Sequence, residues 1–582
     1  MSYSAPVSEM LFALRELGRL DEVAALPGGG ELDLEFVRSV LEQAGRFAEE
    51  VLLPLNRTGD QHGARLENGA VKTPPGFADA YRKFVEAGWQ TLAARPEHGG
   101  QGMPCLVAAA VNEIWASANL AFSLCPLASE NAAETLARHA PAELNQRYLA
   151  RIVKGEWTAP MALTEPQAGS DLSLLRTRAE PEGGAYRLFG TKIFITYGEH
   201  DLTDNIVHLV LARLRGAPEG TRGISLFLVP KFLVRADGSL GERNDVHCVS
   251  LEHKLGIRAS PTAVMAYGQR NGAVGYLVGE PNRGLEAMFV MMNRMRLGVG
   301  VEGLAMAERA YQQARGYARE RIQGRAPDRA SAGPVPIIRH PDVRRMLMDM
   351  KARIEAMRGL SYYAAARMDV AARHPEAAQR KAAQDMVELL TPVIKGWQTE
   401  QAQEIVSLAL QIHGGSGYVE DTGVAQLLRD VRITSIYEAT TGIQAADLAS
   451  RKVGRDGGAT VARLAAEAYA VCRAMESAHD EDQRAIAARL EQGLRSLEQA
   501  TRHIAEKPGA AGVAAAAVPY LMLLGSIAGG WQLARAALVS SEPSRAIVAR
   551  YYTEHVLPRA DAYAEEVLSG ADSVLRLDER GF

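Results

Sequence analysis

The hydrophobic residues of this chain change their spacing along its length, and this change is the strongest constraint on the fold. From about residue 33 to residue 160 they recur at three- and four-residue steps, the spacing of amphipathic helices. From Trp157 onward, short runs of branched and aromatic residues follow, each bounded by Gly, Pro, Asp or Asn, as in antiparallel strands. No helix of useful length separates these runs, which argues against a doubly wound α/β sheet. We therefore expect a compact antiparallel β domain with strands at residues 186–196, 206–214, 224–229, 262–267 and 273–278.

Long helical patterns return after Gly284 and continue to the end of the sequence. Residues 325–341, rich in Pro, Gly and Ser, predict a loop between two long helices, and the glycines at 454–458 predict a further break. The predicted class is α+β. The predicted segments are an N-terminal extension (1–32), an N-terminal α domain (33–158), a central β domain (159–282), a helical bundle (283–455) and an additional C-terminal helical domain (456–582).

The composition is that of a globular protein without a charge bias. Hydrophobic residues make up 47% and charged residues 23% of the 582 residues, which excludes disorder as the dominant state. The formal net charge is −4, so the chain lacks the basic footprint that binding to nucleic acid requires. We expect no nucleic-acid partner.

The cysteines and the apolar segments bear on the compartment. Four widely separated cysteines (Cys105, Cys125, Cys248 and Cys472) form no metal-ligand spacing, so we expect reduced thiols, no metal and a cytoplasmic protein. The N-terminal sequence lacks the features of a signal peptide. Residues 508–534 carry no charge, but Pro519 interrupts them, and we favour a buried helix over a membrane span.

Four stretches of sequence carry the chemical information. The chain has no HExxH, GxSxG or GxxxxGK[ST] motif, and a GGxG run alone is a tight turn at least as often as a phosphate cradle. The informative stretches are MALTEPQAGSD (161–171), GTKIFIT (190–196), RERIQG (319–324) and the segment from QIHGGSGY (411–418) through RDVR (429–432) to IYEATTGIQ (436–444).

At these residues the chain resembles the acyl-CoA dehydrogenase family of flavoenzymes. The motifs, together with KLGIRASPT (254–262), occur in the family's order over roughly residues 34–454. The last block and the N-terminal APVSEMLFAL segment resemble a larger-chain subgroup. This subgroup includes long-chain acyl-CoA enzymes with an added C-terminal domain and the 3-(methylthio)propanoyl-CoA dehydrogenases.

Dehydrogenation of an acyl-CoA needs a base for the α-proton and an acceptor for the β-hydride. No protein side chain accepts a hydride, so a flavin must do so, and the resemblance implies FAD. A carboxylate in apolar surroundings suits the base, because burial raises its pKa toward the working pH. Glu438 matches the family's catalytic glutamate; the residue by itself could also be a carboxylate favoured at a helix start. The resemblance further implies that the backbone N–H of Glu438 and a flavin ribityl hydroxyl polarise the thioester carbonyl.

The resemblance implies that residues of the motifs at 161–171 and 190–196 contact the flavin ring. Met161, Leu163 and Thr164 would line the isoalloxazine, Phe194 would lie beside it, and Thr196 would place its hydroxyl near N5. Alternating aromatic and Thr residues in a strand are also what plain sheet packing produces.

The nucleotide half of the cofactor is assigned to the later motifs. Arg321 matches an arginine that reaches the pyrophosphate of a neighbouring subunit's flavin, which implies a homodimer; the alternative is a surface ion pair within its helix. Gln411, Gly414 and Gly415 match the turn that meets the same half, and Thr440 would contact the adenosine or phosphate side.

The substrate residues are assigned less specifically. Ser170 lies where the family contacts ligand, and Arg296 matches an arginine near the base and the CoA. Asn293 and Met292 lie beside it; the methionines of this stretch could line an acyl pocket, although such a stripe is more often core.

Four positions depart from the family pattern. Ala439 replaces the usual Gly after the catalytic glutamate. Gln323 and Gly324 replace a small polar residue and an aromatic one after the arginine. His413 occupies a commonly aliphatic or aromatic position, and we interpret it as structural.

The leading hypothesis is therefore an FAD-dependent acyl-CoA dehydrogenase of fatty acid β-oxidation that passes electrons to an electron-transfer flavoprotein. The alternatives are a 3-(methylthio)propanoyl-CoA dehydrogenase and an acyl-CoA oxidase. A DNA-binding member of the superfamily is disfavoured, because residues 456–582 hold 13 Lys and Arg against 17 Asp and Glu.

Overall fold

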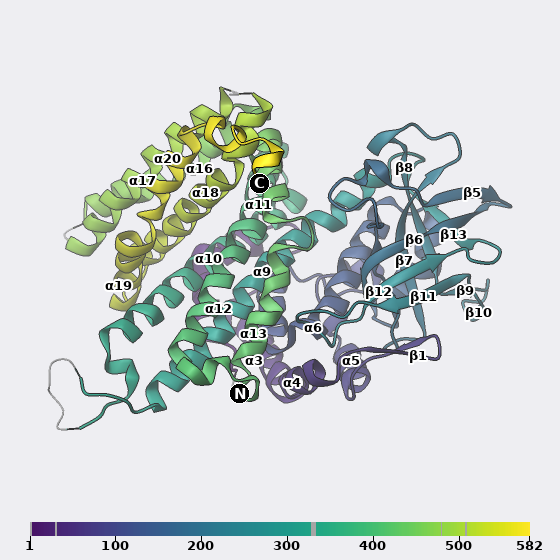
Figure 1. Cartoon of the computed structure of the whole chain (residues 1–582), viewed down its shortest axis with the longest axis horizontal. Coiled ribbons are helices and arrows are strands. Elements are labelled where there is room, and N and C mark those ends of the chain that lie inside the picture. Colours follow the sequence, from purple (N-terminus) through teal and green to yellow (C-terminus); the bar gives the residue numbers. More distant parts are fainter. Residues whose placement is uncertain (1–2, 30–31, 327–332, 479, 507–508) are drawn as a thin grey trace. The chain divides into compact units, whose positions relative to one another are not determined.

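The chain folds into two compact units, shown together in Figure 1. The computed structural model describes residues 3–29, 32–326, 333–478, 480–506 and 509–582. The bundle unit consists of residues 1–45, 104–117 and 299–582, and the sheet unit of residues 46–103 and 118–298. The long helices α6 (Cys105–His139) and α9 (Gly284–Glu320) each contribute residues to both units.

The sheet unit is built on a nine-stranded sheet. Its strand order is β11-β12-β6-β13-β8-β7-β3; in addition β4 pairs with β7, and β5 pairs with β6 and β7. The strands are β3 (Trp157–Thr158), β4 (Met161–Ala162), β5 (Arg178–Glu182), β6 (Ala185–Thr196), β7 (Asn205–Leu214), β8 (Ile224–Pro230), β11 (Val246–Leu251), β12 (Thr262–Tyr267) and β13 (Ala273–Val278). Two hairpins, β1 (Arg65–Glu67) with β2 (Ala70–Lys72) and β9 (Phe232–Val234) with β10 (Leu240–Arg243), accompany the helices α4 (Leu53–His62), α5 (Phe77–Glu86), α7 (Ala142–Leu144) and α8 (Ala150–Val153).

This sheet separates two hydrophobic cores. Val207 and Leu209 of β7 belong to a core that includes residues of α6 and α9, whereas Val210 and Ala212 belong to a core built mainly from strands. Successive side chains of a strand point to opposite faces, so a strand buried on both faces contributes to both cores. This explains why β7 reads as a nearly continuous apolar run.

The five predicted strands are confirmed, with β12 and β13 at the predicted residues. The prediction of a purely antiparallel sheet is wrong, because β3, β4 and β5 pair in parallel with β7. These strands are two to five residues long, too short to show a period in the sequence. The hairpin β1–β2 also interrupts a stretch for which helix was expected.

The bundle unit is helical. It contains α1 (Val7–Phe12), α2 (Leu20–Ala24), α3 (Leu34–Phe47), α10 (Pro341–Arg373), α11 (Ala377–Val393), α12 (Thr399–His413), α13 (Val424–Val431), α14 (Thr441–Ala446), α15 (Gly454–Asp456), α16 (Ala459–Glu476), α17 (Glu481–Ala505), α18 (Ala510–Val539), α19 (Pro543–Tyr551), α20 (Arg559–Leu568) and α21 (Asp572–Leu575). Gly457 and Gly458 have positive φ between α15 and α16, which confirms the predicted break. Of the predicted loop 325–341, residues 327–332 lie outside the described residues, as does Pro508 at the start of the uncharged segment.

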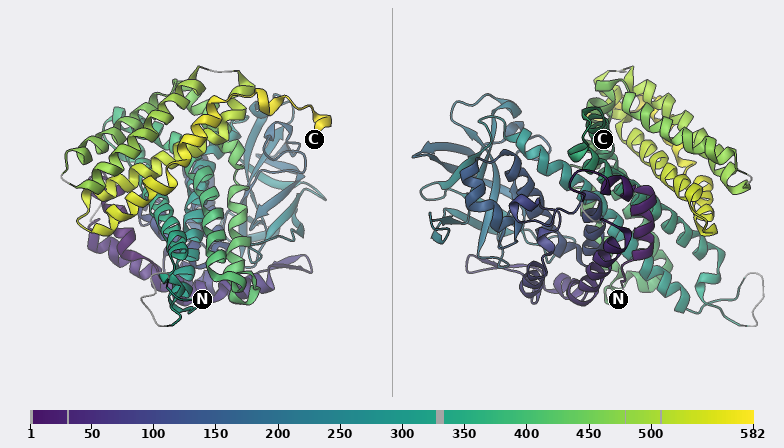
Figure 2. Two further views of the ribbon diagram at one scale, coloured as in Figure 1. Left: turned by 60° about the vertical axis from the view of Figure 1, so that its left-hand side comes forward. Right: turned by 180° about the vertical axis from the view of Figure 1, so that it is seen from behind.

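The long C-terminal helix α18 packs on a π-helical turn, η9 (Ile394–Gln398), that joins α11 to α12. Trp397 of η9 is fully buried. A Cβ placed on Gly525 of α18 would lie 2.2 Å from Trp397 Cγ, and one on Gly529 would lie 2.9 Å from the same ring. The backbone of α18 therefore approaches the indole so closely that only glycine fits. Figure 2 shows the C-terminal helices in yellow and light green lying side by side.

The two ends of the chain also meet within the bundle unit. Arg535 of α18 donates to the carbonyl oxygens of Glu16 and Leu17 at 3.0 and 3.1 Å. Arg545 of α19 pairs with Glu9 of α1 at 2.5 Å. The N-terminal extension is thus fastened to the C-terminal block by charge-assisted contacts.

Among the described residues, α6 and α18 are long and apolar enough to cross a membrane by length and composition. The most apolar window of each is 89% and 61% buried inside the protein, respectively. Such burial is typical of core helices, and it agrees with our interpretation of the uncharged segment as a buried helix.

We expect Gly525→Ala to lower the apparent free energy of unfolding by about 1–3 kcal/mol, because the added methyl group overlaps the Trp397 ring. Gly316→Ala in α9 is the matched control: a Cβ there meets nothing within 4 Å, so the free energy should rise by about 0.5–1 kcal/mol. Urea unfolding followed by circular dichroism measures both. Equal effects of the two substitutions would contradict the packing described.

Candidate functional site

The loop that carries the TEPQAGSD motif is bonded to strand β6 of the sheet unit. The backbone N–H of Ile193 donates to the Thr164 carbonyl oxygen at 2.9 Å. Lys192 Nζ donates to the Leu163 carbonyl oxygen at 2.9 Å. These bonds bring Leu163 and Thr164 alongside the strand that carries Phe194, so the first two motifs form one surface.

Glu165 holds this loop together. Its carboxylate accepts hydrogen bonds from Lys192 Nζ at 2.8 Å, from Thr177 Oγ1 at 2.5 Å, and from the backbone N–H groups of Arg176 and Thr177. Burial raises the pKa of the Glu165 carboxyl, but the Lys192 charge and the hydrogen bonds outweigh it and lower the pKa to about 2. Burial lowers the pKa of Lys192 to about 8 although Glu165 acts in the opposite sense. Glu165 is therefore part of the scaffold of this loop.

Phe194 has an unusual conformation within β6. Its φ is +60°, a region that non-glycine residues seldom occupy, and its side chain is 58% exposed. An exposed ring does not serve sheet packing, and such strain is concentrated at functional sites. Thr196, two residues on, pairs with Thr262 of β12. Ser170 is exposed in the same loop as Thr164, and a Cβ on the preceding Gly169 would contact Thr164 Cγ2 at 3.5 Å.

The methionine stripe at the start of α9 belongs mostly to the core. Met291 and Met295 are buried in the core that α6 and α9 share, and Asn131 Nδ2 lies 3.1 Å from Met295 Sδ. Met292 and Asn293 are half-buried, and Arg296 is buried. Of the residues predicted to contact substrate in this helix, Met292 and Asn293 keep accessible surface.

In the bundle unit, the glycine turn and Arg321 come from neighbouring helix ends. Tyr317 of α9 and His413 of α12 stack with their ring centroids 4.5 Å apart. Burial lowers the pKa of His413, whose Nδ1 lies 2.7 Å from the Ala409 carbonyl oxygen, which agrees with a structural role. The residues four positions before and after Arg321 are Tyr317 and Arg325, so the helical ion pair that we weighed has no acidic partner at these positions.

The turn itself is open. Gly414 has φ +59° and ψ −142°, which only glycine adopts readily. A Cβ on Gly414 or Gly415 would meet nothing within 4 Å, and Gln411 and Arg321 are exposed. Exposed backbone beside a cation suits an approaching phosphate group.

Glu438 lies in a strained loop between η12 (Arg432–Ser435) and α14. Glu438 and Ala439 both have left-handed φ angles, +52° and +73°. The Glu438 carbonyl oxygen accepts from Gln444 Nε2 at 3.1 Å, and the Ala439 carbonyl oxygen accepts from the buried Lys395 Nζ at 2.5 Å. Thr440 caps α14 by accepting from the Ile443 N–H. Two consecutive left-handed residues are costly, and these bonds keep them in place.

The structure adds a residue that the sequence analysis missed. Glu302 of α9 is only 2% exposed, and the Tyr437 hydroxyl donates to its Oε2. A single carboxylate in the otherwise apolar run from Leu297 to Met306 was the signal that could have revealed it.

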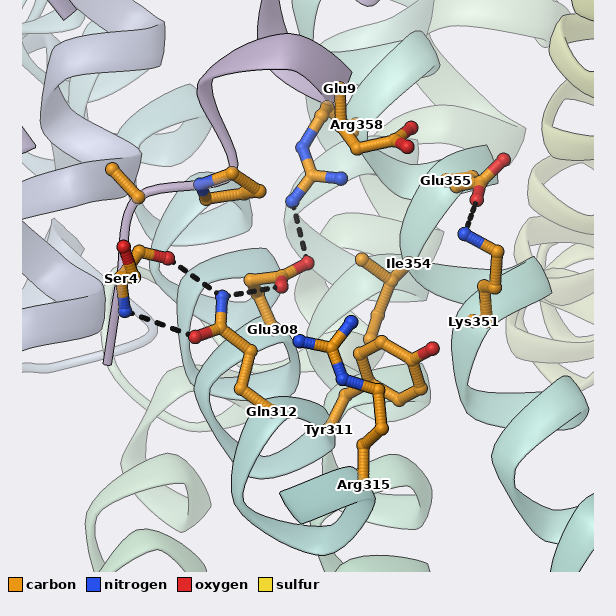
Figure 3. Close-up of a pocket in the computed structure, with 12 residues that line it drawn as sticks. Ser4, Glu9, Glu308, Tyr311, Gln312, Arg315, Lys351, Ile354, Glu355 and Arg358 are labelled. Atoms are coloured by element: carbon orange, nitrogen blue, oxygen red, sulfur yellow. Dashed lines mark hydrogen bonds and ion pairs between the residues drawn. The ribbon is translucent and has the colours of Figure 1, made fainter. Parts of the chain in front are cut away.

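A polar cavity of about 290 Å³ lies elsewhere in the bundle unit, against the N-terminal segment (Figure 3). Gln312 exchanges hydrogen bonds with the Ser4 backbone, and Arg358 pairs with Glu308 at 2.8 Å. Lys351 pairs with Glu355 at 2.6 Å. The charged side chains that line the cavity therefore neutralise one another. The hydrogen bonds of Gln312 attach the N-terminal segment to α9. Among the described residues, no group of three or more His, Cys, Asp or Glu could hold a metal ion, and none of the four cysteines there forms a disulfide.

Comparison with protein families gives four matches in chain order. The N-terminal domain of acyl-CoA dehydrogenases matches residues 36–156, the middle domain residues 160–268 and the C-terminal domain residues 282–453. A family described as acetyl-CoA dehydrogenase C-terminal like matches residues 464–578.

Curated relatives match over the whole length. The 3-methylmercaptopropionyl-CoA dehydrogenase of Ruegeria pomeroyi is 48% identical over 573 residues, which cover 98% of this chain and 96% of that protein. The broad-specificity linear acyl-CoA dehydrogenase FadE5 of Mycobacterium tuberculosis is 32% identical and covers both chains completely. An acyl-CoA dehydrogenase structure from Bacillus anthracis, complexed with FAD, has a TM-score of 0.75 at 20% identity, covering 93% of this chain and 89% of that one, and so supports the fold.

We expect Glu165→Gln to lower the free energy of unfolding by about 2–4 kcal/mol at pH 7, because it leaves Lys192 buried without its counter-ion. Since the folded pKa of Glu165 is depressed, its contribution is complete above the unfolded value of about 4.3 and is lost as the pH falls toward 2. The difference between wild type and variant in urea unfolding should therefore narrow between pH 5 and pH 3. Glu143→Gln, at an exposed ion pair with Arg147, is the control and should change the free energy by less than about 0.5 kcal/mol. A difference that is constant with pH would show that folding does not lower the pKa of Glu165.

Proposed function

The chain belongs to the acyl-CoA dehydrogenase family of oxidoreductases, and on that premise we propose that it oxidises a saturated acyl-CoA to the trans-2-enoyl-CoA with FAD. The observation that carries this proposal is the strained loop in which Glu438 is held by Lys395 and Gln444. Such strain is retained where a side chain must be presented in one orientation.

The residues of both units fit FAD. In the sheet unit, an exposed aromatic ring at Phe194 lies in the strand that carries Thr196 and beside Thr164, a combination suited to a flat ring with a polar edge. In the bundle unit, the open glycines of the turn and the exposed Arg321 suit a pyrophosphate. When bound, FAD would supply the acceptor for the β-hydride.

The roles of the other residues follow. Met161 and Leu163 would line the ring, and Gln411 and Thr440 would contact the nucleotide half. Ser170 and Arg296 would bind the acyl-CoA, with Met292 and Asn293 near the acyl chain. By family resemblance Arg321 and the turn serve a neighbouring subunit's FAD, so we propose a homodimer.

Glu438 would remove the α-proton. Its own backbone N–H would stabilise the charge that develops on the thioester oxygen, a contribution that is large when the donor is fixed in advance. The bonds to the carbonyl oxygens of Glu438 and Ala439 fix the peptide groups on either side of Ala439 and so limit the movement of this donor.

The substrate we propose first is 3-(methylthio)propanoyl-CoA, since the relative of that activity is 48% identical over nearly the whole chain. A straight-chain acyl-CoA is the second candidate, supported by the 32% identical relative. We propose a cytoplasmic enzyme and an electron-transfer flavoprotein as electron acceptor. An oxidase would instead release stoichiometric hydrogen peroxide in air with acyl-CoA alone.

We expect Glu438→Gln to retain FAD and CoA ligands but to bleach at least about 10³-fold more slowly, because the amide cannot accept the α-proton. Anaerobic stopped-flow bleaching of the flavin absorbance measures the rate. Glu420→Gln, which removes an exposed carboxylate paired with Arg429, is the control and should bleach at nearly the wild-type rate. Rapid bleaching of the Glu438 variant would place the base elsewhere.

A panel of thioesters tests the substrate class. We expect 3-(methylthio)propanoyl-CoA and straight-chain acyl-CoAs to have higher kcat/KM values than isovaleryl-CoA or glutaryl-CoA, since the relatives that match the whole chain are named for 3-methylmercaptopropionyl-CoA and for linear acyl-CoA. Steady-state assays with an artificial electron acceptor measure the ranking. The reverse ranking would refute the substrate proposal while leaving the reaction class intact.

A further inference from the structure

A second carboxyl group, that of Glu302, lies against the loop of Glu438. Its side chain is buried on α9, and its Oε2 accepts from the Tyr437 hydroxyl. The other oxygen, Oε1, is buried and has no hydrogen-bond partner within the part of the chain that the structure describes. An ionised carboxylate with one unsatisfied buried oxygen is costly, so burial favours the neutral acid.

Within the described part of the chain, three ionisable groups act on the Glu302 carboxyl. Tyr437 and Glu438 come from the loop, and Lys395 comes from the π-helical turn η9. Burial raises the pKa of Glu302 most strongly; the Tyr437 hydrogen bond lowers it, the Glu438 charge raises it and Lys395 lowers it, which leaves the pKa at about 8. Burial and the charge on Glu302 raise the pKa of Tyr437, so the phenol keeps its proton.

The coupling between the two carboxyl groups is reciprocal. The charge of Glu438 disfavours ionisation of Glu302, and an ionised Glu302 must therefore favour the protonated form of Glu438 by the same energy. In a buried setting this interaction is weakly screened by solvent and salt. The protonation state of Glu302 thus changes the strength of Glu438 as a base.

We propose that Glu302 is a positioning residue: it holds the Glu438 loop through Tyr437 and, when it loses its proton, makes Glu438 a stronger base. This inference rests on the proposed function of Glu438. It gives the proposed reaction a second titrating group that does not touch the substrate.

The proposal predicts a particular pH profile. Below about pH 8 Glu302 is neutral, and the rate of flavin bleaching follows the ionisation of Glu438 alone. Above this pH the new charge strengthens the base, so the rate should rise a second time, by roughly threefold to tenfold.

Two variants separate the roles of the carboxyl group. Glu302→Gln keeps the volume and an acceptor for the Tyr437 hydroxyl but cannot ionise, so the second rise should disappear while the acid side of the profile is unchanged. Tyr437→Phe removes a hydrogen bond that lowers the pKa of Glu302, so the second rise should move to higher pH. Glu320→Gln, at the exposed end of the same helix, is the matched control and should keep the wild-type profile.

Infrared spectroscopy of the protein without substrate gives an independent readout. Glu302 should show the C=O stretching band of a protonated carboxylic acid at pH 6.5, and the band should be lost as the pH passes through about 8. The band should be absent from the Glu302→Gln variant and present in the Glu320→Gln control. If Glu302→Gln fails to fold, Tyr437→Phe still tests the proposal. In that variant the carboxylic acid band should persist to a higher pH than in the wild type, and an unchanged titration would contradict the proposal.

The outcomes distinguish this inference from the proposed function. If no saturated acyl-CoA bleaches the wild type, the proposed function fails, whereas the infrared band still reports on Glu302. If the wild type is bleached and Glu302→Gln shows the same pH profile and the same band, the inference is overturned and the proposed function stands.

Discussion

The hydrogen bond from the buried Lys395 to the Ala439 carbonyl oxygen is the contact on which the candidate catalytic loop depends. It is 2.5 Å long and joins the π-helical turn η9 to a loop with two successive left-handed residues, neither of them glycine. The ammonium group is fully buried, so it is stable only where polar groups surround it. The loop carbonyl supplies such a group, and in return the lysine fixes the conformation at Glu438.

The same turn connects the loop to the C-terminal block. Lys395 faces the candidate catalytic loop. The neighbouring Gly396 and Trp397 face α18, whose Leu521, Gly525 and Gly529 lie against them. A single turn of π-helix therefore contacts the candidate catalytic loop through one residue and α18 of the added helices through the next two. Through α18 the C-terminal block packs against this turn.

The sequence was sufficient for much of the fold and for the order of the motifs. The strands at 262–267 and 273–278 were predictable because turn residues bound each apolar run. The break at Gly457 and Gly458 was predictable because two glycines interrupt a helical pattern. The parallel pairing of β3 and β4 with β7 was not predictable, because a strand of two residues is too short to show alternation of apolar and polar side chains. The prediction that Phe194 and Thr196 contact FAD remains a prediction, although the exposed ring of Phe194 gives it a physical basis.

Other features of the site depend on tertiary contacts that no local pattern encodes. The left-handed φ of Glu438 follows from bonds to residues that are distant in sequence or across a helix start, and the raised pKa of Glu302 follows from burial beside that loop. A crystal structure with FAD and a non-oxidisable acyl-CoA analogue would test the central claim most directly. The account predicts the Glu438 carboxylate about 3–3.5 Å from the α-carbon, with the Lys395 bond to Ala439 intact. A structure in which another carboxylate, such as Glu302, faces the α-carbon while Glu438 points away would contradict it.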